Sequence, residues 1–151
     1  MAGCTNKGKM RLLETLRGVS LPTNFYVMLF TSASAPTSDS NVASDLTEIA
    51  AGNGYTTGGY SLTKNTTDFD TISEDDSGNF GSLKLKDVIF TASGGSIPAS
   101  GSGARYACLV DSDGTVADRE IWIYWDLTSD RSVSSGQAIT LADCEIKISE
   151  S

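Results

Sequence analysis

The stretch Asn24-Phe-Tyr-Val-Met-Leu-Phe-Thr31 decides the fold, because it is a nearly unbroken apolar run of residues that favour β-strands. A strand with one face in solvent alternates apolar and polar residues, whereas this run stays hydrophobic from position 25 to position 30. We therefore expect a strand that is covered on both faces, by the protein core on one side and by a helix or a partner on the other.

A short amphipathic helix is predicted just before this strand, over residues 9–18. Its apolar and charged residues occupy different faces at helical spacing: Met10, Leu12, Leu13 and Leu16 against Lys9, Arg11, Glu14 and Arg17. Thr5 or Asn6 is suited to cap the start, and Gly18 suits the left-handed residue that ends a helix. A helix of three turns at most is unstable alone, so it must pack on another surface.

The rest of the chain alternates between short apolar segments and loops rich in Gly, Ser and Thr. We expect strands over residues 60–64, 83–90, 105–110, 119–127 and 137–149, with changes of apolar parity near Asp87 and Ala142 that indicate bulges. Residues 31–44 are expected to form a loop, 45–50 a single helical turn, and 68–81 an acidic, polar segment. There is no βαβ rhythm, so the predicted fold is all-β, an antiparallel β-sandwich or flattened barrel with a short N-terminal helix.

Length and composition favour one globular domain: 151 residues, of which 39% are hydrophobic and 20% charged. We divide the chain into an N-terminal arm with the short helix over residues 1–20 and a single β-sandwich domain over residues 21–151. No apolar run has the length of a membrane helix, and the N-terminus lacks the apolar core of a secretory signal. The expectation is a protein that folds in a reducing cytoplasm.

Charge is distributed unevenly along the chain. Residues 1–20 contain four basic residues and one acidic residue, a net charge of +3, so the remainder carries −11 of the total of −8. An acidic body repels nucleic acid and anionic membranes, so neither is an expected partner. The basic segment is either a solvated tail or an arm that docks on a neighbouring copy.

Histidine is absent, which removes the commonest general base and metal ligand at neutral pH. The three cysteines, Cys4, Cys108 and Cys144, have no CxxC spacing. Cys108 and Cys144 lie within apolar strands and are expected to be buried. Cys4 lies in a polar segment and is either a free thiol or the site of an intermolecular disulfide. We expect no enzyme, no cofactor and no metal site.

The acidic residues offer weak alternatives to that expectation. The stretch Asp111-Ser-Asp-Gly114 resembles the start of a calcium loop but lacks its later ligands, so an Asp-Gly hairpin turn is the preferred interpretation. Glu74, Asp75 and Asp76 are expected to form a solvated acidic loop. A hydrolase would require two carboxylates to converge in a cleft, from among Asp111, Asp113, Asp118, Glu120 and Asp126. The glycines between positions 52 and 59 match no phosphate-binding pattern.

Aromatic residues crowd the strand predicted at residues 119–127. Simple alternation places Trp122 and Tyr124 on one face, and Ile121, Ile123 and Trp125 on the other. The core accounts for one of these faces, so the Trp122 and Tyr124 face is predicted to be a protein interface or, alternatively, a platform on which sugar rings stack.

These features together resemble a family of small tailed-bacteriophage virion proteins, the tail-fibre-like, head-decoration or collar proteins. The resemblance covers most of the chain and is carried by short motifs of common residues: Leu12, Leu13 and Leu16, residues 26–32, Gly58-Gly59-Tyr60, residues 107–111, residues 125–127, Val133, Gly136-Gln137 and residues 139–141. It implies a β-sandwich-like fold, assembly in multiple copies and no enzymatic activity.

We therefore expect a non-enzymatic phage virion structural protein, made in the host cytoplasm, that assembles as a decoration, collar or fibre-base layer. Its expected partners are other copies of itself and neighbouring capsid, neck or tail proteins. The alternative is a receptor- or carbohydrate-binding module of a tail fibre. The candidate interface residues are Met10, Arg11, Leu13, Leu16, Arg17, Tyr26, Met28, Trp122 and Tyr124, with Cys4 as the candidate for an intermolecular disulfide.

Overall fold

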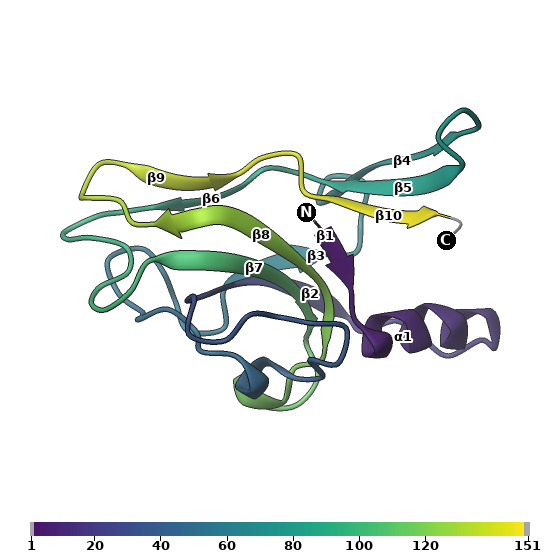
Figure 1. Cartoon of the computed structure of the whole chain (residues 1–151), viewed down its shortest axis with the longest axis horizontal. Helices are drawn as coiled ribbons and strands as arrows, with labels where there is room; N and C mark the ends of the chain where they lie inside the picture. Colours follow the sequence, from purple (N-terminus) through teal and green to yellow (C-terminus); the bar gives the residue numbers. More distant parts are fainter. Residues whose placement is uncertain (1, 150–151) are drawn as a thin grey trace.

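The apolar run at residues 25–30 forms β2 (Asn24–Phe30), an inner strand of a five-stranded antiparallel sheet. The computed structural model describes residues 2–149 and orders this sheet as β1 (Ala2–Cys4), β8 (Ile121–Arg131), β7 (Ala104–Asp111), β2 and β3 (Tyr60–Thr63). Figure 1 shows these strands as the lower layer of the molecule.

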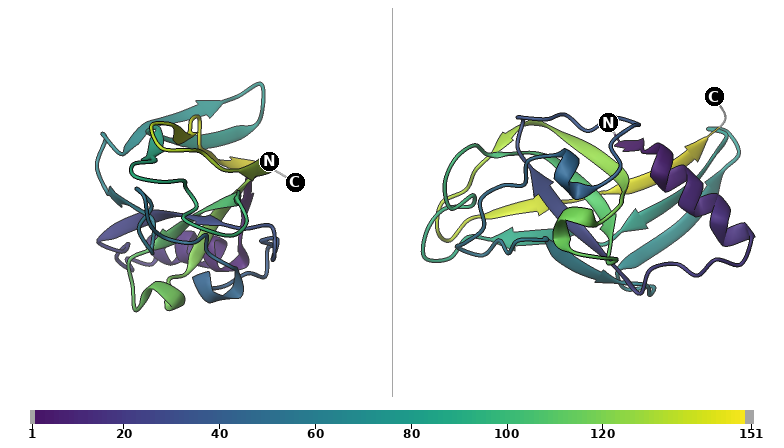
Figure 2. Two further views of the ribbon diagram at one scale, coloured as in Figure 1. Left: turned by 90° about the vertical axis from the view of Figure 1, so that its left-hand side faces the viewer. Right: turned by 90° about the horizontal axis from the view of Figure 1, so that it is seen from below.

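A second layer faces this sheet and is built from two small sheets placed end to end (Figures 1 and 2). One contains β10 (Glu145–Ser149), β5 (Phe80–Leu85) and β4 (Phe69–Asp75), and the other pairs β6 (Val88–Thr91) with β9 (Ala138–Leu141). The chain passes from β5 to β6 at residues 86–87 and from β9 to β10 at residues 142–144. The Leu85 amide donates to the Cys144 carbonyl at this joint (2.9 Å), so the layer is one bent ribbon with the parity changes that the sequence indicates.

The main hydrophobic core lies between the two layers. Phe25, Val27 and Leu29 of β2 meet Leu85 and Phe90 of the second layer, and all five side chains are buried. At about 1.5–3 kcal/mol for each large apolar side chain removed from water, this contact dominates the stability of the sandwich. The predicted fold class, an all-β antiparallel sandwich with a short N-terminal helix, is confirmed.

The other face of β2 is also buried, but not by the helix or a partner as expected. Met28 and Phe30 pack against Ala43 and Leu46, which belong to the long connection between β2 and β3. This connection contains the 3₁₀ turn η1 (Ala43–Asp45) where a helical turn over residues 45–50 was expected. The side chain of Asp45 accepts hydrogen bonds from the amides of residues 41 and 42, which holds the turn under the sheet.

Residues 2–4 of the N-terminal segment are part of the five-stranded sheet. β1 pairs with β8, and Thr5 then starts α1 (Asn6–Leu16) as its N-cap, its side chain accepting from the Gly8 amide at 2.9 Å. The Thr5 hydroxyl also donates to the Ile121 carbonyl, and its amide donates to the Trp122 carbonyl at 3.0 Å. The predicted helix is thus confirmed with an earlier start, and Gly18 has the positive φ expected after its end.

The segment at residues 68–81 was expected to be acidic and polar, with Glu74, Asp75 and Asp76 in a solvated loop, but most of it forms β4 and the turn into β5. The side chains of β4 are mostly exposed, so the strand lacks the apolar alternation by which strands are recognised. Charged residues on such an edge strand prevent further β-pairing. The resulting β4–β5 hairpin projects at the same end of the molecule as α1 (Figure 1).

Candidate functional site

An open, mainly apolar cleft of about 450 Å³ lies between α1 and the sheet of β4, β5 and β10, and residues of the main core form its floor. The cleft is lined by Trp122, Ile123 and Phe25 of the five-stranded sheet. The helix side contributes Leu12 and Leu21, and the hairpin side contributes Phe69, Ile72, Leu83, Ile146 and Ile148. A cleft of this size and lining is typical of a binding site rather than of a packing defect.

Large apolar side chains beside this cleft remain in solvent. Leu13 and Leu16 of α1 are 64% and 84% exposed, and Ile72 and Ile148 of the opposite wall are 82% and 64% exposed. Ile72 and Ile148 line the cleft, whereas Leu13 and Leu16 lie on the helix that contributes Leu12 to it. Isolated exposed apolar residues are ordinary, but several on the elements that form one apolar cleft mark a surface for interaction.

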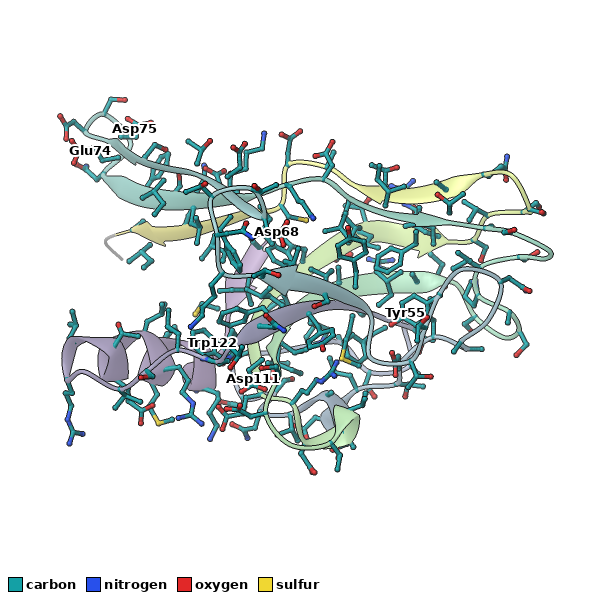
Figure 3. All side chains as sticks on the ribbon, turned by 180° about the vertical axis from the view of Figure 1, so that it is seen from behind. Tyr55, Asp68, Glu74, Asp75, Asp111 and Trp122 are labelled. Atoms are coloured by element: carbon teal, nitrogen blue, oxygen red, sulfur yellow. The ribbon has the colours of Figure 1, made fainter. Side chains whose placement is uncertain are left out.

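The two walls of the cleft differ in charge. Among residues 2–149, Lys9 and Arg17 on the helix side make no ion pair, and neither do Asp70, Glu74 or Asp76 on the hairpin. Figure 3 shows Glu74 and Asp75 at the far end of the hairpin, on the same side of the molecule as α1. The apolar cleft is therefore flanked by a helix that carries free cations and by a hairpin that carries free carboxylates in the described structure, although these charged residues do not line the cleft itself.

An ion-pair network fixes the base of α1 on β8. Arg11 Nε lies 2.5 Å from Glu120 Oε2, Lys7 Nζ lies 3.4 Å from Glu120 Oε1, and Arg11 also pairs with Glu14 at 2.9 Å. Partial burial opposes ionisation of Glu120, but the hydrogen bond and charge of Arg11 together with Lys7 lower its pKa below the ordinary value. Arg11, predicted as an interface residue, is thus engaged within its own chain.

A β-bulge corrects the prediction for the aromatic strand. Leu109 pairs with Ile123 and Val110 with Ile121, so Trp122 is an extra residue in β8. Its side chain consequently joins Ile123 in the main core instead of sharing a face with Tyr124, and only 4% of it is exposed. Phe25 packs edge-on against it at 5.0 Å between ring centroids. A buried indole cannot stack on a sugar, so the predicted glycan platform is wrong.

The other predicted interface residues separate into exposed and covered sets. Met10, like Leu13 and Leu16, is exposed on α1. Met28 is buried in the second cluster, so its prediction as an interface residue is wrong for this fold. Tyr26 is half-buried beneath the Arg119 guanidinium, 3.7 Å from the ring centroid, and Tyr124 packs half-buried against the second cluster.

The cysteines lie in three different environments. Cys4 is half-buried in β1, and burial raises its pKa, although the nearby Lys9 opposes this rise. Cys108 and Cys144 are buried as expected, and burial raises both pKa values, to about 11 for Cys144. All three are free thiols in the described monomer; an intermolecular disulfide at Cys4 stays a prediction.

Asp111 is buried at the end of β7. Its Oδ1 atom accepts from the Glu120 amide at 2.9 Å, whereas Oδ2 has no hydrogen-bond partner within residues 2–149. Burial raises its pKa, and the charges of Asp113 and Glu120 add to the effect. The following connection contains the 3₁₀ turn η2 (Val116–Asp118), so the predicted tight Asp-Gly hairpin is a longer loop. No group of three potential metal-ligating side chains occurs in the described part of the chain.

Sequence reasoning missed Ile72 and Ile148 as members of this site. Ile72 lies in a segment that was expected to be polar, and Ile148 was assigned to a strand without a surface role. The available signal was the pair Ile146 and Ile148, which share one face of a predicted strand next to the chain end. That signal does not show whether this face of the strand is covered, because no local pattern shows where the opposite sheet ends.

Comparison of the chain with protein-family models, with curated proteins and with solved structures found no match in any of the three. Within residues 2–149, no helix combines the length and the hydropathy that a membrane span requires.

Proposed function

We propose that this protein is a non-enzymatic structural component of a tailed-bacteriophage virion that assembles in multiple copies as a decoration, collar or fibre-base layer. The observation that carries the proposal is the apolar cleft, whose lining residues Ile72 and Ile148 are exposed and whose helix α1 also exposes Leu13 and Leu16. When another protein covers such groups, they are removed from water, and this burial is favourable.

Two further features support this assignment. The sequence resemblance to small virion proteins implies assembly in multiple copies. The position of the site also suits an assembly role, because α1 and the β4–β5 hairpin project from one end of a rigid sandwich (Figure 1). In a layer of many copies, weak contacts are sufficient because multivalency multiplies them.

The test is quantitative mass spectrometry of purified virus particles. We expect this chain in particles freed of lysate proteins by density-gradient centrifugation, in a constant ratio to the major capsid protein. That ratio also separates a layer over the capsid, which requires many copies, from a ring at the neck or tail. Recovery of the chain in the soluble lysate but not in particles would overturn the proposal.

A further inference from the structure

The cleft presents two surfaces at one end of the molecule that are complementary to each other. The helix, whose Leu12 lines the cleft, also carries the exposed residues Leu13 and Leu16 together with Lys9 and Arg17, which make no ion pair within residues 2–149. The hairpin wall offers exposed Ile72 beside acidic residues, of which Asp70 and Glu74 make no ion pair in the described structure. Each wall is thus apolar along its side and opposite in charge to the other.

We propose that the cleft is the docking site for a second copy of this chain, with α1 of each copy against the β4–β5–β10 sheet of the other. This inference rests on the proposed function, whose multi-copy assembly it describes at residue level. In a dimer with a twofold axis each contact occurs twice, because a contact from the first copy to the second is repeated from the second copy to the first. Rotation about that axis places the basic helix of one copy on the acidic hairpin of its partner.

The placement of the walls favours a closed pair over a ring. A ring or filament needs two complementary surfaces on different sides of the subunit, so that each copy passes the contact onward. Here both surfaces border one cleft at one end of the sandwich, as Figures 1 and 3 show for α1 and the hairpin. When the helix of one copy contacts the hairpin of the other, the helix of the second copy is brought to the hairpin of the first. Both contacts therefore form within one closed dimer.

Charge complementarity favours a second copy of the chain over an apolar small molecule as the occupant of the cleft. A lipid chain would use the apolar floor but would leave the charges of both walls without partners. A second copy covers the floor and the exposed leucines and isoleucines, and it also pairs Lys9 and Arg17 with the hairpin carboxylates. Pairs at such a rim contribute more to specificity and association rate than to affinity, so added salt slows association.

The apolar part of the inference is tested by analytical ultracentrifugation of the full-length protein. We expect the wild type to form a dimer, and Leu16→Asp and Ile72→Asp each to raise the dimer dissociation constant about tenfold or more. Both side chains are more than 80% exposed in the monomer, so each variant should fold with an unchanged circular dichroism spectrum. The matched control is Ile89→Asp in β6, where an equally large apolar residue is 50% exposed away from the cleft.

The charged part is tested by exchange of the two signs. Arg17→Glu alone and Glu74→Arg alone should each weaken the homodimer. An equimolar mixture of the two variants should form a heterodimer of restored affinity, because its acidic helix meets the basic hairpin while its wild-type helix meets the wild-type hairpin. The double variant R17E/E74R should likewise dimerise again.

This inference would be overturned by a wild-type protein that stays monomeric, by a dimer that tolerates both Leu16→Asp and Ile72→Asp, or by an absence of rescue in the charge exchange. A monomer that carries a bound lipid in native mass spectrometry would identify a different occupant and overturn it as well. These failures are distinguishable from failure of the proposed function. A protein present in particles that does not dimerise contradicts only the docking mode, and a dimer absent from particles contradicts only the virion role.

Discussion

The position of Asp111 in the chain holds its side chain in a buried environment that is unfavourable for a carboxylate. Asp111 ends β7, where its Oδ1 atom accepts the Glu120 amide and ties the connection between β7 and β8 to the sheet. The same burial leaves Oδ2 without a partner in the described structure and raises the pKa of the carboxyl group. A protonated carboxyl is less costly there than a carboxylate, so this residue makes stability depend on pH.

The direction of that dependence follows from proton linkage. Between the unfolded-state pKa of about 3.9 and the higher folded-state pKa, Asp111 binds more protons in the folded protein than in the unfolded chain. Its contribution to stability therefore falls as pH rises through this window. We expect Asp111→Asn to gain stability relative to the wild type as pH increases from about 4 through the raised pKa of Asp111, by about 1.4 kcal/mol per unit of pKa difference. Urea denaturation across this range measures the change, and parallel curves for the two proteins would contradict it.

At the scale of elements, the contact between α1 and β8 determines where the helix wall of the cleft stands. Gly8 is the buried residue of α1, and a Cβ atom there would lie 2.3 Å from the Trp122 carbonyl oxygen. The absence of a side chain therefore lets the helix approach the strand closely. The Thr5 cap and the Glu120 ion pairs then set its direction, and the leucines of its last turns extend beyond the sandwich.

We expect Gly8→Ala to destabilise the protein by about 1–3 kcal/mol, because the overlap with β8 outweighs the roughly 1 kcal/mol that alanine gains in a helix. The control is Gly81→Ala in β5, where no heavy atom lies within 4 Å of the added Cβ atom and the change should stay within about 0.5 kcal/mol. Thermal denaturation compares the two variants. Equal stability of Gly8→Ala and the wild type would show that the helix can move away from β8 at no cost.

At the scale of the whole molecule, the sandwich has a core that is buried within one chain, while one end exposes apolar residues beside the cleft. The main core and the second cluster are closed on both faces of β2. Of the eight large apolar residues that are exposed in the described structure, Leu21, Ile72 and Ile148 line the cleft, and four more lie on α1 or in the segment just after it. The fold thus separates the part that determines stability from the part that we propose determines assembly.

If a second copy covers the cleft, stability depends on protein concentration. Association with the folded state alone stabilises it by mass action, so the unfolding midpoint of the wild type should rise with concentration. The expected change is about 1.4 kcal/mol per mole of dimer for each tenfold increase above the dissociation constant. Differential scanning calorimetry of the wild type and Leu16→Asp measures it, with the midpoint of the variant expected to be nearly constant. A constant midpoint for both proteins would contradict dimerisation.

Sequence alone determined the elements whose signal is local. The apolar run at residues 25–30 predicted a doubly covered strand, and the spacing of Met10, Leu13 and Leu16 predicted a helix. The parity change near Asp87 predicted a bulge in one strand, and the structure has a break between β5 and β6 at that point. Periodicity, capping and turn chemistry depend on residues a few positions apart, so these predictions need no knowledge of the partner segments.

The tertiary structure alone decided what covers each face and what is left open. The bulge that buries Trp122 arises from its register with β7, the polar segment at residues 69–75 becomes a strand by pairing with β5, and Met28 is covered by the distant residues 43–46. Pairing register and long-range packing bring together segments far apart in the chain, and no local pattern encodes which of them meet. The cleft itself is the clearest case, because it exists only where α1 and the β4–β5–β10 sheet project together beyond the sandwich.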